Sequence, residues 1–300
     1  MTAPHADDVT DMAHPRRGGA LLVVLVFAAL ISSLAIASSR TMLSGASAAA
    51  VFVDTIRADE LGRAATQLVA YRLQTEQPGL RRGGAFAARL PSAQIDIDYV
   101  AETSRIDINL APPKLLAALF VAGGAAPSIA DDIASRAERT QGRKPMTPSR
   151  PAASANAPAT QSDVNTLVFV RTEQIIDAWG MPASLYRIVR PALTVASRSA
   201  KVDPLLADRL VILALMQGDE ERTVDFLERR RHGFANADEA LAQLPTDTRT
   251  YAGFPPARAV KAAARVTIAQ RFTRRYEFVM SIQDGPNTET RVLSWLPLDR

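Results

Sequence analysis

The chain has 300 residues, of which 47% are hydrophobic and 22% are charged, and its formal net charge is +4 at pH 7. This length and apolar content suffice for one sizeable core or two modest ones. The small net charge, spread over 35 basic and 31 acidic residues, predicts no basic patch and gives little support to nucleic-acid binding. Because the chain contains no cysteine, disulfides and thiolate metal sites are excluded.

The N-terminal region contains an uncharged segment from residue 20 to residue 39. At about 1.5 Å per residue this segment makes roughly 30 Å of helix, which is enough to cross the hydrocarbon core of a bilayer. Arg16 and Arg17 precede the segment, and only Arg40 follows it closely. Because positive charge favours the cytoplasmic side, we expect a membrane-spanning helix at 20–42, with a cytoplasmic N-terminus and the remaining chain on the outer side of the membrane.

Residues 1–19 are polar and aperiodic, as expected of a leader. Two processing points fit the flanking residues. A secretory signal peptide would be cut after Ala35-Ile36-Ala37, in which the two alanines are small. A cut between Gly19 and Ala20, in the stretch that directly follows the two arginines, would leave the helix on the mature protein. The second arrangement resembles the leader of type IV pilins and type II secretion pseudopilins, in which a prepilin peptidase cuts after a glycine on the cytoplasmic side. The resemblance also implies that Ala20 becomes a methylated N-terminus.

The fifth position after this second cut is Val24. Pilin-like subunits usually carry a glutamate there, which in the family is thought to pair with the N-terminal amine of the neighbouring subunit. A carboxylate inside the membrane is costly unless it is paired, and a subunit with no neighbour above it has nothing to pair with. The missing glutamate therefore resembles the K-type minor pseudopilins (general secretion pathway protein K, the GspK family), which are placed at the tip of the fibre.

The apolar helix is expected to continue past the membrane. Small and apolar residues from 41 to 53 are followed by apolar residues at spacings of three and four, an amphipathic pattern that ends at Pro78-Gly79. We therefore predict a helix that runs to about residue 77. In pilin-like proteins the first half of such a helix packs between subunits, and the second half packs on the subunit's own sheet.

Two stretches after the helix, 94–100 and 104–109, alternate polar and apolar residues as half-buried strands do. Glu102-Thr103 between them can turn the chain, which predicts a hairpin. Aspartates on these strands suggest either a calcium or catalytic carboxylate site or the solvent face of a sheet, and the alternation favours the solvent face. These aspartates are Asp96, Asp98 and Asp107.

Asn109 is expected to cap a helix that begins at Pro112-Pro113, because proline is tolerated in the first turn. Residues 109–116 are close to the "N-x-A-P-x-x-L-L" stretch of the K-type pseudopilins, and 108–136 more loosely resembles a DNA-binding helix-hairpin-helix. That motif binds phosphate through backbone amides, but here the second helix carries Asp131-Asp132, which would repel phosphate. We interpret this helical pair as scaffold.

Residues 140–163 are rich in proline, alanine and serine without an apolar period, which predicts a mobile loop. Trp179, in a short helix that ends at Gly180, is expected to lie in a core. The stretch 202–211 aligns with 106–115 at a constant offset of 96 residues. This alignment indicates a weak internal repeat.

The chain ends in three predicted strands at 265–270, 276–282 and 290–296. The stretch Asp284–Asn287 between the last two has strong turn chemistry, so we predict an antiparallel hairpin. This terminal pair, which includes Trp295, also resembles the K-type pseudopilins.

The sequence carries no catalytic or phosphate-binding motif. His5 and His14 lie in the leader and are given no role, and His232 lies in an arginine-rich helical face with no nucleophile placed near it in sequence. We therefore expect a non-enzymatic assembly protein without a cofactor. The family resemblance implies that calcium can bind, but no residues match a dedicated calcium loop.

Together these features predict an α+β chain with a pilin-like long N-terminal transmembrane helix, an antiparallel sheet and a large inserted α-helical domain. The expected order is a leader at 1–19, then the membrane helix at 20–42 with its continuation. A pilin-like α/β domain is expected from 85–109 together with 192–300, and the inserted helical domain from 110–191.

The resemblance implies a minor pseudopilin of the type II secretion system that initiates or caps the periplasmic pseudopilus for export of folded proteins. The implied partners are the I- and J-type minor pseudopilins, the pseudopilus, prepilin peptidase and the inner-membrane secretion platform, and no nucleic acid. The implied location is the bacterial inner membrane, with a single pass and a periplasmic C-terminal domain. Two alternatives stay open: a minor pilin of a type IV pilus, and a membrane-anchored periplasmic nucleic-acid-binding module.

Overall fold

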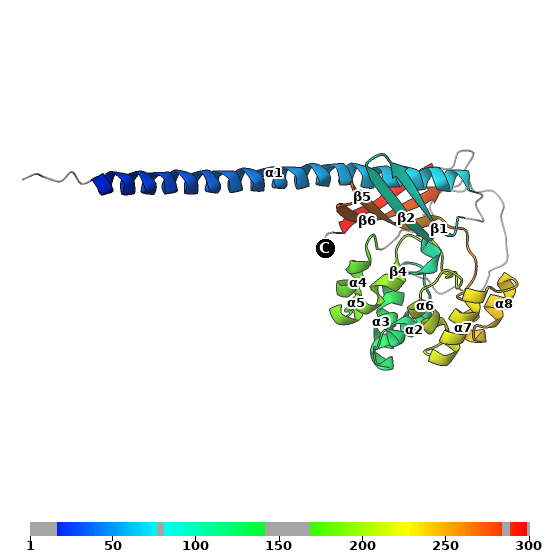
Figure 1. Cartoon of the computed structure of the whole chain (residues 1–300). Coiled ribbons are helices and arrows are strands. Elements are labelled where there is room, and N and C mark those ends of the chain that lie inside the picture. Colours follow the sequence, from blue (N-terminus) through cyan, green and yellow to red (C-terminus); the bar gives the residue numbers. More distant parts are fainter. Residues whose placement is uncertain (1–16, 77–80, 142–168, 284–288, 299–300) are drawn as a thin grey trace, which may run out of the picture. The chain divides into compact units, whose positions relative to one another are not determined.

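The structure, a computed structural model, describes residues 17–76, 81–141, 169–283 and 289–298. The chain forms two compact units, Met1–Arg57 and Ala58–Arg300, which we describe separately. The N-terminal helix α1, Arg17–Thr75, contains the described part of the first unit and the beginning of the second (Figure 1). The sequence predicted this helix with an end two residues further on.

In the first unit, Leu21–Ser39 is long and apolar enough to cross a membrane, by length and composition. All of its side chains are exposed. A helix that is apolar on every side and this long is typical of a segment that lies in a membrane. The segment suits a single-pass anchor or a signal sequence.

The second unit contains a five-stranded antiparallel sheet in the order β1-β2-β5-β6-β7. Its strands are β1 Gly83–Leu90, β2 Ala93–Ala101, β5 Ala259–Ile268, β6 Phe272–Gln283 and β7 Glu289–Leu298. The part of α1 that begins at Ala58 packs on one face of this sheet, and both contribute to one core. The predicted α+β architecture of apolar N-terminal helix, antiparallel sheet and helical insertion is therefore confirmed, as is the hairpin of β6 and β7.

The hairpin predicted from 94–100 and 104–109 is wrong. Strand β2 pairs instead with β1, whose glycines and alanines hid the alternation that marks a strand. After β2 the chain forms a 3-10 helix, η2 Glu102–Ser104, and a short strand, β3 Ile106–Asp107. Strand β3 pairs in parallel with β4, Leu193–Thr194, in a separate two-stranded sheet. The alternation in 104–109 was real, but it belongs to a second core.

That second core is helical, and it includes Trp179 as predicted. Its elements are α2 Pro113–Ala122, α3 Pro127–Thr140, η3 Thr172–Gln174, α4 Ile175–Trp179, α5 Ala183–Val189, η4 Arg190–Ala192, α6 Arg209–Leu215, α7 Glu220–His232, α8 Ala237–Ala242 and α9 Thr246–Arg249 (Figure 1). The core joins buried residues from Ile106 to Ala252, so the helical part extends well past residue 191, the expected end of the insertion. Residues 142–163 of the predicted mobile loop lie outside the described residues.

The internal repeat has a structural counterpart at the start of each copy. Asp107 Oδ1 accepts a hydrogen bond from the backbone N–H two residues later at 3.0 Å, and Asp203 Oδ1 does the same at 3.0 Å. In both copies the aspartate carbonyl accepts the N–H groups three and four residues later. A helix then begins six residues after each aspartate, at Pro113 and at Arg209. The same polar turn therefore opens both copies.

Asn109 does not cap α2, although the sequence predicted that role. The N-cap of α2 is Pro112, without a side-chain hydrogen bond. Asn109 instead binds the backbone of Phe169, donating from Nδ2 to the carbonyl at 3.0 Å and accepting the N–H on Oδ1 at 2.9 Å. A distant buried segment with unpaired backbone groups competed for the side chain, and nothing in the local sequence reveals it.

Candidate functional site

The predicted processing site lies in the first turns of α1. The helix begins at Arg17, so Gly19 and Ala20 are inside it, while residues 1–16 of the predicted leader lie outside the described residues. Val24 is one turn further on, and its side chain is 67% exposed. The face of the first unit at this position is therefore aliphatic, as the sequence indicates, and offers no carboxylate to an amine.

The first unit has a second group of exposed apolar side chains beyond the uncharged segment. Val51, Phe52, Val53 and Ile56 are 55%, 66%, 59% and 49% exposed. We call them the 51–56 cluster. Val51 follows Ser39 by twelve residues, which is about 18 Å of helix. Exposed apolar groups of this size, so far from the end of the uncharged segment, make this part of α1 a candidate association surface.

The sequence predicted a helix here, and the family resemblance implied that its first half packs between subunits, without pointing to the 51–56 cluster in particular. The signal was present as three consecutive bulky residues, Val51 to Val53, which surround the helix instead of forming one stripe. From Ala58 onward the helix does form one stripe, and the side chains of that stripe are buried against the sheet.

Strand β7 is the other exposed apolar element. It lies at the edge of the sheet, and four of its side chains are between 39% and 51% exposed. They are Val292, Leu293, Leu296 and Leu298. An apolar edge strand with open backbone groups favours association with other chains, which natural proteins usually prevent with charges or coverage. This strand is therefore a second candidate assembly surface.

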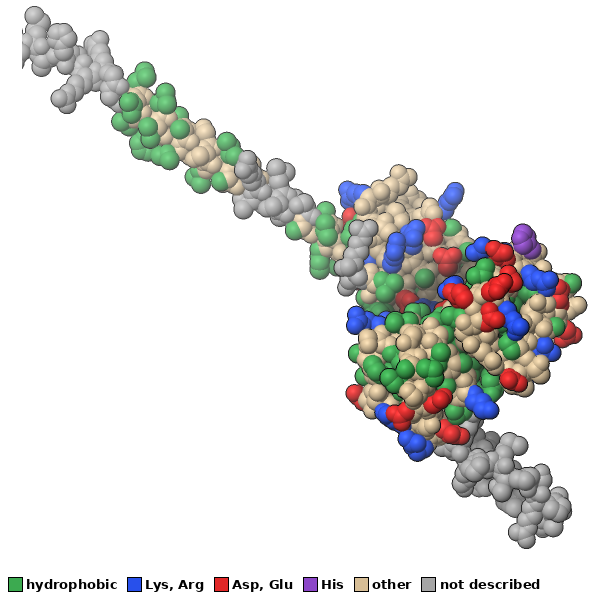
Figure 2. Space-filling model, turned by 90° about the horizontal axis from the view of Figure 1, so that it is seen from below, with side chains coloured by type: hydrophobic (Ala, Val, Ile, Leu, Met, Phe, Trp, Pro, Cys, Tyr) green, Lys and Arg blue, Asp and Glu red, His purple; other side chains and the backbone are tan. Residues whose placement is uncertain are grey.

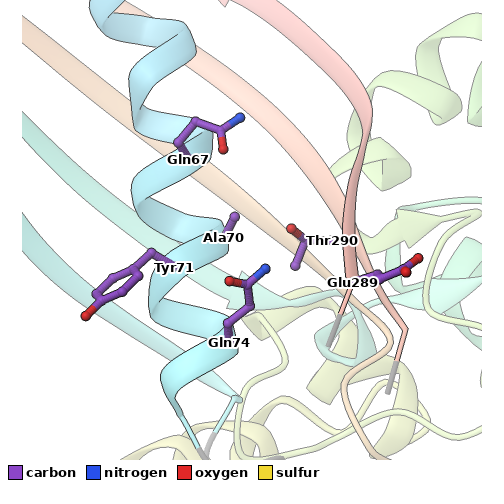
Figure 3. A pocket seen from close by; sticks show the side chains of 6 residues that line it. All are labelled: Gln67, Ala70, Tyr71, Gln74, Glu289 and Thr290. Carbon is purple, nitrogen blue, oxygen red and sulfur yellow. The ribbon is translucent and has the colours of Figure 1, made fainter. Parts of the chain in front are cut away.

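A groove of about 480 Å³ lies between α1 and the beginning of β7 (Figure 3). It is lined by Gln67, Ala70, Tyr71, Gln74, Glu289 and Thr290. Figure 3 shows Gln74 and Thr290 on the same side of α1, whereas Tyr71 points to the opposite side. The lining offers amides, one carboxylate and hydroxyl groups, but it pairs no nucleophile with a base. This polar lining suits contact with a polar surface.

The three aspartates have different environments. Asp98 is exposed and Asp96 is half-buried on β2, as expected for the solvent face of a sheet. Asp107 is only 1% exposed, so the same interpretation is wrong for it. Its Oδ2 accepts hydrogen bonds from Ser197 Oγ at 3.1 Å and the Arg198 backbone N–H at 2.9 Å. Burial raises the pKa of the Asp107 carboxyl above its usual range, although these hydrogen bonds oppose the shift.

The described part of the chain contains no preformed metal site. Among those residues, no group of three or more Asp, Glu or His side chains is placed to hold a metal ion. The calcium implied by the family resemblance therefore has no ligand set to which it can be assigned here.

Charges of both signs alternate over the helical part, as Figure 2 shows on the face that it presents. Arg209 pairs with Glu220, and Arg222 pairs with Asp219 at 3.3 Å. His232 is exposed in the last turn of α7. This pattern is typical of a solvated surface, and it lacks the single-sign field that phosphate binding requires.

The sequence matches no protein-family model and no curated protein. Among solved structures, the chain is similar to a chain of the GspK–GspI–GspJ complex from the type 2 secretion system of enterotoxigenic Escherichia coli. The identity is 16%, the match covers 82% of this chain and 95% of that chain, and the TM-score is 0.49. At this identity the similarity concerns the fold and says nothing about what the chain does.

Proposed function

We propose that the chain is a K-type minor pseudopilin of a type II secretion system, a non-enzymatic subunit at the tip of the pseudopilus. The 51–56 cluster carries this proposal. A lone membrane-anchored binding module needs an apolar segment only within the bilayer, whereas a fibre subunit needs a second apolar surface where its helix meets those of its neighbours. The helix α1 has both.

Features of the sequence support the assignment to the K type and to the tip of the pseudopilus. Leader cleavage between Gly19 and Ala20 places an aliphatic Val24 at the fifth mature position, where other subunits pair a carboxylate with the amine of a neighbour. A subunit without that carboxylate suits the end of a fibre. The large helical part would also obstruct stacking of a further subunit above it.

The processing step is tested by mass analysis of the N-terminus of the membrane-inserted protein. The mature chain is expected to begin at Ala20, with a methylated amine, in a cell that contains prepilin peptidase. A start near Ser38 would show a secretory signal peptide, and an intact Met1 would show no processing. Either of these results would contradict the pseudopilin proposal.

Assembly is tested with the soluble portion, roughly residues 43–300, mixed with the I- and J-type minor pseudopilins of the same system. We expect one complex of low stoichiometry by size-exclusion chromatography with light scattering, and a monomer when this chain is alone. Homopolymerisation would instead favour a repeating fibre subunit. Failure to bind either folded partner, together with salt-dependent retention on DNA, would favour the nucleic-acid-binding alternative.

A matched pair of variants tests the 51–56 cluster. Phe52→Ser combined with Ile56→Ser removes two exposed apolar side chains, each of which stabilises a buried interface by about 1.5–3 kcal/mol, so the complex should weaken roughly 100-fold or more. Ile129→Ser combined with Ile188→Ser is the control, because these apolar residues of α3 and α5 are similarly exposed, at 49% and 54%, and lie outside the cluster, the groove and β7. An undiminished affinity in the double variant would show that the partners bind elsewhere.

A further inference from the structure

The sheet and the helical part of the second unit are joined by a partly buried ion pair. Arg82, just before β1, donates from Nε to Asp203 Oδ2 at 3.0 Å, and its Nη2 binds the same oxygen. The side chain of Asp203 is 2% exposed, whereas that of Arg82 is 38% exposed. The guanidinium also lies over the ring of Phe254 at 5.2 Å from the ring centre. Arg82 therefore reaches from the sheet into the second copy of the repeat.

The first copy of the repeat shows that the polar turn does not need an arginine. Asp107 occupies the equivalent turn, and its Oδ1 makes the same bond to the backbone. Its Oδ2 is satisfied by neutral donors, the Ser197 hydroxyl and the Arg198 N–H. The turn therefore forms without a guanidinium. In the second copy, Oδ2 of Asp203 is bound by Arg82, which lies outside the repeat. We therefore assign Arg82 a role other than forming the turn.

The surroundings of Asp203 point to the junction between the two parts. The Asp203 backbone N–H donates to the Thr103 carbonyl at 2.8 Å, and the Ala101 N–H donates to the Arg82 carbonyl at 2.7 Å. Arg230 of α7 also lies near, but its guanidinium donates to the carbonyls of Pro204 and Ala207. The side chain of Asp203 is almost fully buried, and Arg82 supplies the positive charge that offsets the lost hydration of its ionised form.

We propose that Arg82 is a positioning residue that holds the helical part in one orientation on the sheet. When the pair is broken, each part keeps its own core, and the angle between them becomes variable. This device goes beyond the proposed function, and it acts in a single chain without any partner subunit. A helical part that acts as a cap needs such a fixed orientation.

The orientation is measured on the full-length chain in detergent micelles by pulsed electron spin resonance between two nitroxide labels. Because the chain has no cysteine, the substitutions Ala263→Cys on β5 and Asp225→Cys on α7 provide unique labelling sites. Both residues are exposed and have different cores beneath them. In the labelled chain with an intact ion pair, the distances between the two labels are expected to form a single narrow distribution.

Arg82→Gln and Asp203→Asn each break the ion pair. Asparagine at position 203 keeps a side-chain oxygen that can accept the Leu205 backbone N–H of the turn. Both variants should broaden the distribution and shift its maximum while the far-UV circular dichroism stays unchanged, and the double variant should add nothing further. Arg82→Lys should give an intermediate width, because lysine keeps the charge and loses the planar fork. Arg265→Gln, at an exposed position of β5, is the matched control and should leave the distribution narrow.

An unchanged narrow distribution in a folded Arg82→Gln chain overturns the proposal, because a purely local role would alter the melting temperature and not the distance. If Arg82→Gln does not fold, Arg82→Lys decides the question, because that variant keeps a charge beside Asp203 and loses the planar fork that fixes the geometry of the pair. Broadening supports the proposal, and a distribution as narrow as that of the wild type refutes it. The I- and J-type partners are absent from this experiment, so its result is independent of the pseudopilin assignment.

Discussion

Replacing Gly62 by alanine tests how closely α1 packs on the sheet. A Cβ atom at this position would lie 2.8 Å from Cε2 and 2.9 Å from Cδ2 and Cζ of Tyr276 on β6. Non-bonded carbon atoms are optimally separated by about 3.5–4.0 Å, so these three contacts are strongly repulsive. Either the helix or the ring has to move.

The ring of Tyr276 is held on several sides. It is fully buried, and it stacks on Trp295 with ring centres 5.2 Å apart and an angle of 25° between the ring planes. Its hydroxyl donates to Asp59 Oδ1 at 2.9 Å, and the same oxygen accepts from Arg274 at 2.8 Å. The ring is therefore held by Trp295 on β7 and is tied to α1 through Asp59, three residues before Gly62, so neither the ring nor the helix can move away cheaply.

Two opposing effects determine how much Gly62→Ala changes the free energy of unfolding. Alanine favours a helix interior over glycine by about 1 kcal/mol. Overpacking of a well-filled core costs roughly 1–3 kcal/mol, and contact with a fixed aromatic ring puts this case near the upper value. We expect Gly62→Ala to lower the free energy of unfolding by about 2 kcal/mol in balance.

The assay is urea unfolding of the soluble portion, followed by far-UV circular dichroism. Ala64→Gly is the matched variant, because Ala64 is an exposed helix residue in the same turn and reports the propensity difference alone, about 1 kcal/mol of destabilisation. If Gly62→Ala proves as stable as the wild type or more stable, the helix and the sheet do not pack as closely as the structure requires, and the reasoning fails.

Two further predictions concern the helical part. Asn109→Ala leaves the buried N–H and carbonyl of Phe169 without partners, so the free energy of unfolding should fall by roughly 2–4 kcal/mol in the same urea assay, and a loss under 1 kcal/mol would show that water replaces the amide. Burial raises the pKa of Asp107 in the folded chain above its usual value of 3.8, so the folded state binds a proton more readily than the unfolded state. The stability from this group is complete below the unfolded pKa and is lost as pH rises through the folded pKa. The stability of the wild type relative to Asp107→Asn should therefore decrease with rising pH above 3.8 in unfolding measurements at a series of pH values, and a constant or increasing difference would contradict the burial effect.

The sequence by itself determined the features that depend on neighbouring residues. An uncharged, mostly apolar run of the length of Leu21–Ser39 favours a helix, because a helix satisfies its backbone hydrogen bonds within the segment and leaves only apolar side chains and a few serines on its surface. The hairpin of β6 and β7 follows from alternation on both sides of a turn-forming stretch. The short helix α4 ends at Gly180 because the C-cap adopts a φ of 62°, which glycine tolerates best. In each case the physical cause lies within a few residues.

Only the tertiary structure decided which partners the remaining elements have. Alternation in 104–109 predicted a strand but could not show that Ile106 faces a helical core instead of the main sheet, since burial depends on segments almost ninety residues away. Asp107 and Asp203 occupy equivalent turns in the sequence, yet one carboxylate meets a hydroxyl and the other meets a guanidinium. Those differences arise from contacts between segments far apart in the sequence. Such contacts cost chain entropy, which the fold as a whole offsets, and they produce no periodic pattern in the local sequence.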